Sequence, residues 1–250
     1  MNSMKLFILL FSIAFFIFDI QATPTSLFWT NASTDIQQQG TCNINYDTYF
    51  SLRHRKQDPK MPPDFGIEFG LFSFDKIAAE AGFDFLCGAK DPWFFNAKIG
   101  FSEEDLLFKG CPSFNIGIFE VGTKRGKTDY NVVDFIIGKT FSSMNFRLFG
   151  GLYSGKKTIG KDTKGFMVGL SKPFFHSTYH DGTEYDRLVF MADYASGKNV
   201  VGGGGFGLSY YFTPTIDIIT GPVWFHDRKV NGRWKWTIQI DIGLDFSSFS

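Results

Sequence analysis

Carboxylates at alternate positions of long extended segments are the residues of this sequence best placed to do chemistry. Glu68 and Asp84, for example, each lie between apolar neighbours. Successive side chains of a strand point to opposite faces, so these carboxylates share a face from which the neighbouring apolar residues are absent. Such a face favours cations where water reaches it. The charged residues expected on this face, lining an interior, are Asp47, Glu68, Glu80, Asp84, Lys98, Asp134, Arg147, Asp193 and Asp241.

Two other motifs could bind a metal or a phosphate only on or next to a helix, and the sequence predicts no helix at either. His176 and His180, with Glu184 nearby, have the chemistry of zinc ligands, but a spacing of four residues requires a helix that the surrounding sequence does not predict. Residues 202–207 match the pattern G-x-G-x-x-G, yet no helix follows whose N-terminus would bind a phosphate. We therefore expect no catalytic residues, no metal and no cofactor, and we expect that the protein is not an enzyme.

The alternation is clearest in residues 234–246, which read W-K-W-T-I-Q-I-D-I-G-L-D-F. One face is wholly apolar and the other is polar or small. At about 3.3 Å per residue this segment extends roughly 40 Å, which suits a tilted membrane strand better than a soluble strand of about five or six residues. The residues expected to face lipid include Trp224, Trp234, Trp236, Ile238, Ile240 and Phe246.

The same period continues from Thr41 to Phe246 without a competing helical signal. It predicts an all-β fold, a twelve-stranded antiparallel up-and-down transmembrane β-barrel, because closure removes the edges of long apolar strands. Tight turns are expected at 73–76, 141–144 and 212–215, and longer links at 53–63, 122–131, 154–164 and 225–233. Two further links, 102–112 and 172–186, are long although they belong with the tight turns on the periplasmic side. A secreted β-sandwich is the alternative.

The inner face of this barrel also carries glycines and aromatic rings, among them Phe72, Phe149 and Tyr211. A glycine leaves room for a bulky ring on the opposite wall. The rings therefore either narrow the bore or close it.

The N-terminal residues direct the chain out of the cytoplasm. Residues 1–22 combine a basic start, a short apolar run and Ala22 as a small residue for cleavage, which is the layout of a signal peptide. Residues 23–40 are polar and suit either a periplasmic segment or a plug inside the barrel. Residues 41–250 form the barrel. The expected location is the bacterial outer membrane.

Composition limits the remaining classes of protein. The 250 residues include 25 basic and 25 acidic side chains, so net charge gives no case for nucleic-acid binding. The 32 Phe, 9 Tyr and 5 Trp exclude a disordered chain. Three cysteines are too few for a disulfide scaffold. Cys87 and Cys111 remain candidates for a single disulfide in an oxidising compartment.

Several stretches in the second half of the chain have a recognisable character. They are D-Y-A-S-G-K-N at 193–199, the glycines at 202–205, L-S-Y-Y-F-T-P at 208–214, T-G-P-V-W-F at 220–225 and W-K-W-T at 234–237. In these the chain resembles uncharacterised porin-like outer-membrane β-barrels of Gram-negative bacteria. The resemblance implies a fold and a location, without an agreed substrate. Such barrels commonly end on an aromatic residue, whereas four residues follow Phe246 here.

The function that these features predict is a passive channel or transporter for small solutes with an acidic lumen. The alternative is a closed barrel with a structural or surface-interaction role. A barrel enzyme acting on lipids is less favoured, since no spacing links His226 to a serine. The expected partners are outer-membrane lipid, lipopolysaccharide facing the basic links, small polar or cationic solutes and the barrel insertion machinery, but no nucleic acid.

Overall fold

The alternating segments fold into strands that each pair with their neighbours in the chain. The computed structural model describes residues 26–52, 58–74, 76–103 and 108–246, so the predicted signal peptide (1–22) lies outside the described residues. The strands are β1 (Thr41–Phe50), β2 (Asp64–Phe74), β3 (Ile77–Leu86), β4 (Trp93–Phe101), β5 (Ser113–Gly122), β6 (Asp129–Phe141), β7 (Phe146–Ser154), β8 (Lys164–Thr178), β9 (Glu184–Ala195), β10 (Gly203–Thr213), β11 (Ile216–Phe225) and β12 (Trp234–Asp245).

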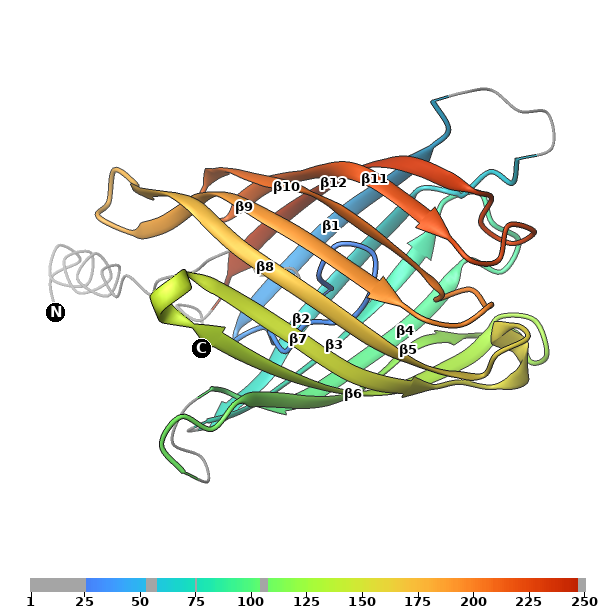
Figure 1. Ribbon diagram of the computed structural model, residues 1–250, viewed down its shortest axis with the longest axis horizontal. Helices are drawn as coiled ribbons and strands as arrows, with labels where there is room; N and C mark the ends of the chain where they lie inside the picture. Colours follow the sequence, from blue (N-terminus) through green and yellow to red (C-terminus); the bar gives the residue numbers. More distant parts are fainter. Residues whose placement is uncertain (1–25, 53–57, 75, 104–107, 247–250) are drawn as a thin grey trace, which may run out of the picture.

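The sheet closes through an antiparallel pairing of β1 with β12. Thr41 lies opposite Asp245 at one end of this seam, and Phe50 lies opposite Trp236 at the other. All twelve strands belong to one closed barrel, as Figure 1 shows. The predicted twelve-stranded antiparallel barrel is therefore confirmed, and the alternative of two stacked sheets is wrong.

The connections give the barrel two different ends. Of the described residues, the turn end carries 76, 102–103, 108–112, 142–145, 179–183 and 214–215, together with the start of β1. The loop end carries 51–52, 58–63, 87–92, 123–128, 155–163, 196–202 and 226–233. The prediction of a long link at 172–186 is wrong. β8 and β9 continue to pair as far as Thr178 and Glu184, so only residues 179–183 connect them. Two 3-10 turns, η1 (Ser142–Met144) and η2 (Lys157–Ile159), lie in the connections. No helix in the described part of the chain has the length and apolar character needed to cross a membrane.

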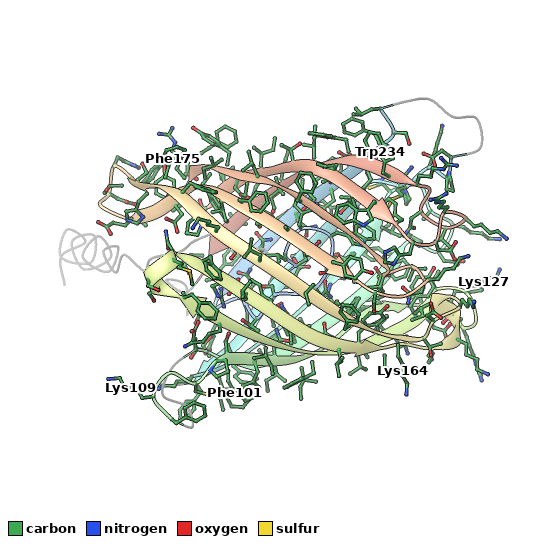
Figure 2. The ribbon with its side chains drawn as sticks, in the orientation of Figure 1. Phe101, Lys109, Lys127, Lys164, Phe175 and Trp234 are labelled. Carbon is green, nitrogen blue, oxygen red and sulfur yellow. The ribbon has the colours of Figure 1, made fainter. Side chains whose placement is uncertain are left out.

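The outer surface of the barrel is apolar. Leu152 is 66% exposed and Phe175 is 65% exposed, and similar exposed side chains project from all the strands except β3 and β9. Trp93, Trp224 and Trp234 are exposed and lie near the loop end. Phe101 and Phe175 lie nearer the turn end, and Figure 2 shows both together with Trp234. Soluble monomers rarely expose so large a continuous apolar surface. An outward apolar band with aromatic girdles is the pattern of a membrane-spanning barrel.

The inner surface has an apolar part and an acidic part. Inward residues of β6 and β8, including Val132, Ile136 and Met167, are fully buried and pack in one cluster. The acidic residues gather mainly on β1 to β3, where inward positions carry Asp47, Glu68 and Asp84. The residues that face the interior are therefore polar on one part of the wall and apolar on another.

The three cysteines are free. Cys87 follows β3 at the loop end, whereas Cys111 precedes β5 at the turn end. The nine residues of β4 lie between these ends and extend roughly 30 Å. A disulfide joining Cys87 and Cys111 is therefore ruled out.

The outward apolar band makes a direct prediction for Ile240, an exposed residue in the middle of β12. The substitution Ile240→Arg places a charge where we expect acyl chains. It should lower the free energy of unfolding from lipid vesicles by about 2–4 kcal/mol. Val230→Arg is the control, because Val230 is equally exposed but lies in the loop-end connection 226–233. Equal stability of the two variants in denaturant titrations would contradict a membrane-facing β12.

Candidate functional site

The residues that precede β1 run inside the barrel. We call residues 26–40 the inner segment; Figure 1 shows it in blue within the ring of strands. The backbone N–H groups of Phe28, Trp29 and Thr30 donate to one carboxylate oxygen, Oδ2 of Asp193, at 2.9, 2.8 and 2.7 Å. The hydroxyl of Thr30 donates to the same oxygen at 3.1 Å. An ionised acceptor makes each of these bonds stronger than a neutral one, so Asp193 fixes the start of the inner segment.

Other polar contacts fix the rest of the inner segment. Arg147 forms a salt bridge with Asp35, and Lys98 donates to the backbone oxygen of Asp35 at 2.8 Å. The backbone N–H of Gln37 donates to Glu80 Oε2 at 2.6 Å. Charged residues of β3, β4 and β7 thus hold the inner segment from several sides.

Glycines on the inner face provide the space that the inner segment occupies. A Cβ atom on Gly205 or Gly207 would lie 2.5 or 2.4 Å from the ring of Phe28, and one on Gly169 would lie 2.4 Å from Leu27. The glycines do make room for an aromatic ring, as predicted. The ring is that of Phe28 in the inner segment, however, and not one on the opposite wall.

The inner segment lies between two cavities. One, of about 320 Å³, is lined by Phe28 to Asn31 and by loop-end residues such as Met61 and Asn231. The other, of about 950 Å³, is lined by residues 33–39 and by turn-end residues. Of the residues that line either cavity, only Ser26 lines both. The inner segment therefore divides the described interior of the barrel.

The cavity at the loop end is strongly acidic, and we call it the acidic chamber. Its carboxylates are Asp47, Asp64, Glu68, Glu80, Asp84, Glu120, Asp134 and Asp241. The basic residues in its lining are Lys60 and Lys98, and Lys98 lies 3.5 Å from Glu80. Negative charge therefore dominates the chamber, whose protein walls concentrate the electric field.

The structure separates the charged residues that the sequence placed in the interior. Asp47, Glu68, Glu80, Asp84, Lys98, Asp134 and Asp241 line the acidic chamber. Asp193 and Arg147 bind the inner segment instead. Of the residues expected to face lipid, Trp224, Trp234, Ile238, Ile240 and Phe246 are exposed. Trp236 is partly buried, and its indole N–H donates to the Thr220 hydroxyl at 2.8 Å.

Sequence reasoning missed two acids of the chamber because neither fits a regular strand. Asp64 is the first residue of β2, where the preceding link hides the period. Glu120 lies at an irregularity in the pairing of β5 with β6, between Phe119 and Val121, and has a positive φ of 55°. A bulge adds one residue to a strand and changes the face that follows, so Glu120 turns inward. No sequence signal distinguishes this bulge.

A second bulge corrects the placement of Phe72. The pairing of β2 with β3 shifts between Gly70 and Phe72, and Phe72 is exposed with the outer residues. It is therefore not an inner ring, whereas Phe149 and Tyr211 are buried.

The histidine motif does not form a metal site. The two ring nitrogens of His176 each lie 3.2 Å from a carboxylate, of Asp186 and of Glu184. Among the described residues, no group of three or more His, Cys, Asp or Glu side chains is placed to hold a metal ion.

Residues 58–62, which precede β2, contact the barrel wall and the acidic chamber. Lys235, a buried residue of β12, donates to the Pro59 oxygen at 2.7 Å and lies 3.3 Å from Asp58 Oδ2. The Ser51 hydroxyl and the Lys235 ammonium hold the pKa of Asp58 below its usual value. This connection places Lys60 and Met61 at the chamber wall.

Comparisons with known proteins give only distant similarities. No protein-family model matches the chain, and no curated protein matches it significantly. Among solved structures, the KdgM porin has a TM-score of 0.48 and 6% identity, and the match covers 81% of this chain and 98% of that one. The NanC porin gives 0.44 and 9%, covering 82% and 98%, and a mutant Rh. blastica porin gives 0.43 and 10%, covering 88% and 67%. Similarity this low carries no information about what this chain binds.

The contacts at Asp193 predict how the inner segment responds to mutation. Asp193→Asn removes the charge that three backbone N–H groups share, and hydrogen bonds to charged groups contribute about 1.5–3 kcal/mol against about 1 kcal/mol for neutral ones. Hydrogen exchange of the amides of residues 28–30 should become about tenfold faster, as measured by mass spectrometry on the folded barrel.

Asp217→Asn is the matched control for this experiment. Asp217 is a buried carboxylate of β11 that accepts a hydrogen bond from Ser209. Exchange in the inner segment should stay at the wild-type rate. Equal acceleration in both variants would mean that Asp193 has no special part in holding the segment.

Proposed function

We propose that this chain is an outer-membrane β-barrel channel that passes small cationic solutes through an acidic interior. The observation that carries the proposal is the acidic chamber, in which eight carboxylates face two lysines inside a barrel with an apolar outer surface. A pore lined by carboxylates favours cations, because their charge is stabilised there while anions are repelled. The predicted signal peptide supports export to that membrane.

The inner segment acts as the gate in this proposal. It lies between the acidic chamber and the turn-end cavity, so passage requires at least part of it to move. Its connections to Asp193, Arg147 and Glu80 are polar contacts that water and ions can replace. Leu27 and Phe28 pack in the apolar cluster and oppose complete release.

The loop end faces the outer leaflet in this proposal. Lys124, Lys127, Lys156 and Lys164 lie at or next to loop-end connections, and Figure 2 shows Lys127 and Lys164 at that end. Basic side chains at this level would attract the phosphates of lipopolysaccharide. The acidic chamber would then open toward the outside.

A closed barrel with a structural role is the second candidate. It is favoured by one observation, the number of hydrogen bonds that hold the inner segment across the bore. Nothing in such a protein would require the segment to move. The two candidate functions therefore differ in whether ions pass through the barrel, which only the channel allows.

Planar-bilayer recordings test the channel directly. The purified full chain should show rare openings, because the inner segment occupies the bore. A variant lacking residues 26–39 should show steady currents that select cations over anions. Full-length Asp193→Asn should open more often than wild type, and it serves as the second variant if the deletion does not fold.

Selectivity gives the control for the acidic chamber. Replacing Asp84 and Asp134 by Asn should lower the cation-over-anion permeability ratio severalfold, with a larger effect at low salt because screening is weaker. Asp186→Asn, which changes a carboxylate beside the turn-end cavity, should affect the ratio less. If the deletion of residues 26–39 and Asp193→Asn both show no current, although heat-modifiable gel mobility shows each to be folded, the channel proposal is wrong and the closed barrel is favoured.

A further inference from the structure

Three neighbouring parts of the loop end, residues 123–129, 155–164 and 196–202, carry a dense group of basic side chains. We call these side chains the basic platform, and each of them is exposed. They are Lys124, Arg125, Lys127, Lys156, Lys157, Lys161, Lys164 and Lys198. The carboxylates in the same stretches are Asp129 and Asp162. Positive charge therefore dominates this side of the loop end.

Hydrogen bonds fix the backbone that carries the basic platform. The connection 155–163 is joined on one side to β6, because the N–H of Lys156 donates to the backbone oxygen of Tyr130 at 2.9 Å. It is joined on the other side to the next connection, because the N–H of Val200 donates to the backbone oxygen of Ile159 at 2.9 Å. Ile159 is fully buried in the apolar cluster. The three parts thus form one continuous surface.

The positive charge of the basic platform is largely without counter-charge in the described structure. Lys156 lies 3.1 Å from Asp129 Oδ2, but the other seven basic side chains form no ion pair with a described residue. Oδ2 of Asp162 accepts the backbone N–H of Lys198 at 2.8 Å. A surface of this kind complements a partner with several negative charges.

The basic platform is continuous with the apolar outer wall of the barrel. Lys164 begins β8 and pairs with Ser154, in the register in which exposed Phe166 pairs with exposed Leu152. Lys164 is therefore on the outer face, directly above apolar side chains. A lysine at such a boundary lays its carbon chain along apolar surface and keeps its ammonium group at the polar level. This position suits the phosphate of a lipid better than a soluble polyanion.

The outer wall below Lys164 has open space at one glycine. Gly150 pairs with Ile137 and Val168, both of which are exposed on the outer face. A Cβ atom on Gly150 would meet nothing within 4 Å. Val168 is four residues from Lys164 along β8, which is about 13 Å. An acyl chain that descends from a headgroup at Lys164 can therefore lie over Gly150.

We propose that the basic platform and the wall below it bind a glycolipid of the outer leaflet that carries two phosphate groups. The phosphates contact the platform side chains, as clusters of lysine and arginine next to a membrane bind anionic headgroups, and one acyl chain lies over Gly150. The proposal rests on the function above only in taking the loop end to face the outer leaflet. It adds a defined site for one lipid to a general attraction between opposite charges.

Native mass spectrometry of the detergent-folded full chain tests the site, with bisphosphoryl lipid A as the probe. One lipid molecule should stay bound. Monophosphoryl lipid A should bind about fivefold more weakly, since it offers fewer charge-assisted hydrogen bonds. Glucose 1,6-bisphosphate, which carries two phosphates but no acyl chain, should not bind at the same concentration.

Charge reversal within the platform is the first variant. Lys127→Glu combined with Lys164→Glu should weaken lipid A binding by about tenfold or more, and Figure 2 shows both lysines at the loop end. Arg228→Glu combined with Lys229→Glu is the matched control, because it reverses two exposed charges of the loop end outside the platform. The control should change the affinity by less than about twofold, since distant exposed charges are screened.

Gly150→Trp is the second variant, and it leaves every charge in place. Its ring would fill the open space on the outer wall and should weaken lipid A binding by about threefold or more. Wild-type affinity in either folded variant, equal weakening by the control pair, or equally tight binding of glucose 1,6-bisphosphate would overturn the proposal. Lipid A binding without ionic current would leave this site standing while removing the channel, and cation current without lipid A binding would do the reverse.

Discussion

Closure of the sheet between β1 and β12 is the constraint on which the rest of this structure depends. Pairing from Thr41 to Phe50 along the seam removes the last unpaired strand edges, which a hydrocarbon environment does not tolerate. Once the sheet is closed, regular strand residues face either outward or inward. Apolar residues such as Ile240 then face outward, and the alternate residues must fill or line an interior.

The interior is filled by the chain itself. The inner segment would bring unsatisfied backbone N–H groups into a buried space, a costly arrangement. Asp193 satisfies three of them with one oxygen, and inner-face glycines give Phe28 and Leu27 room to pack. The Gly202–Gly207 run thus has a structural explanation, since Gly205 and Gly207 lie against Phe28.

The distribution of charge follows from where the inner segment lies. Its apolar residues pack with the cluster that includes Val132 and Ile136, and the wall formed by β1 to β3 is left facing the acidic chamber. Carboxylates on that wall lie close together and have few basic partners. Such an arrangement is unfavourable for stability, and unfavourable groupings of this kind are typical of functional sites.

The sequence by itself favoured the barrel, because a period of two over long segments gives each strand one apolar and one polar face. Only the closing pair of β1 with β12 excluded the β-sandwich. The sequence also determined which regular positions point inward, including Glu68, Asp84 and Asp134. Glu120 and Phe72 could not be assigned, since a bulge changes the face of a strand without leaving a mark in the sequence. The position of residues 26–40 and their contact with Asp193 were decided only by the tertiary structure. Each depends on residues far apart in the chain that become neighbours only when the sheet closes.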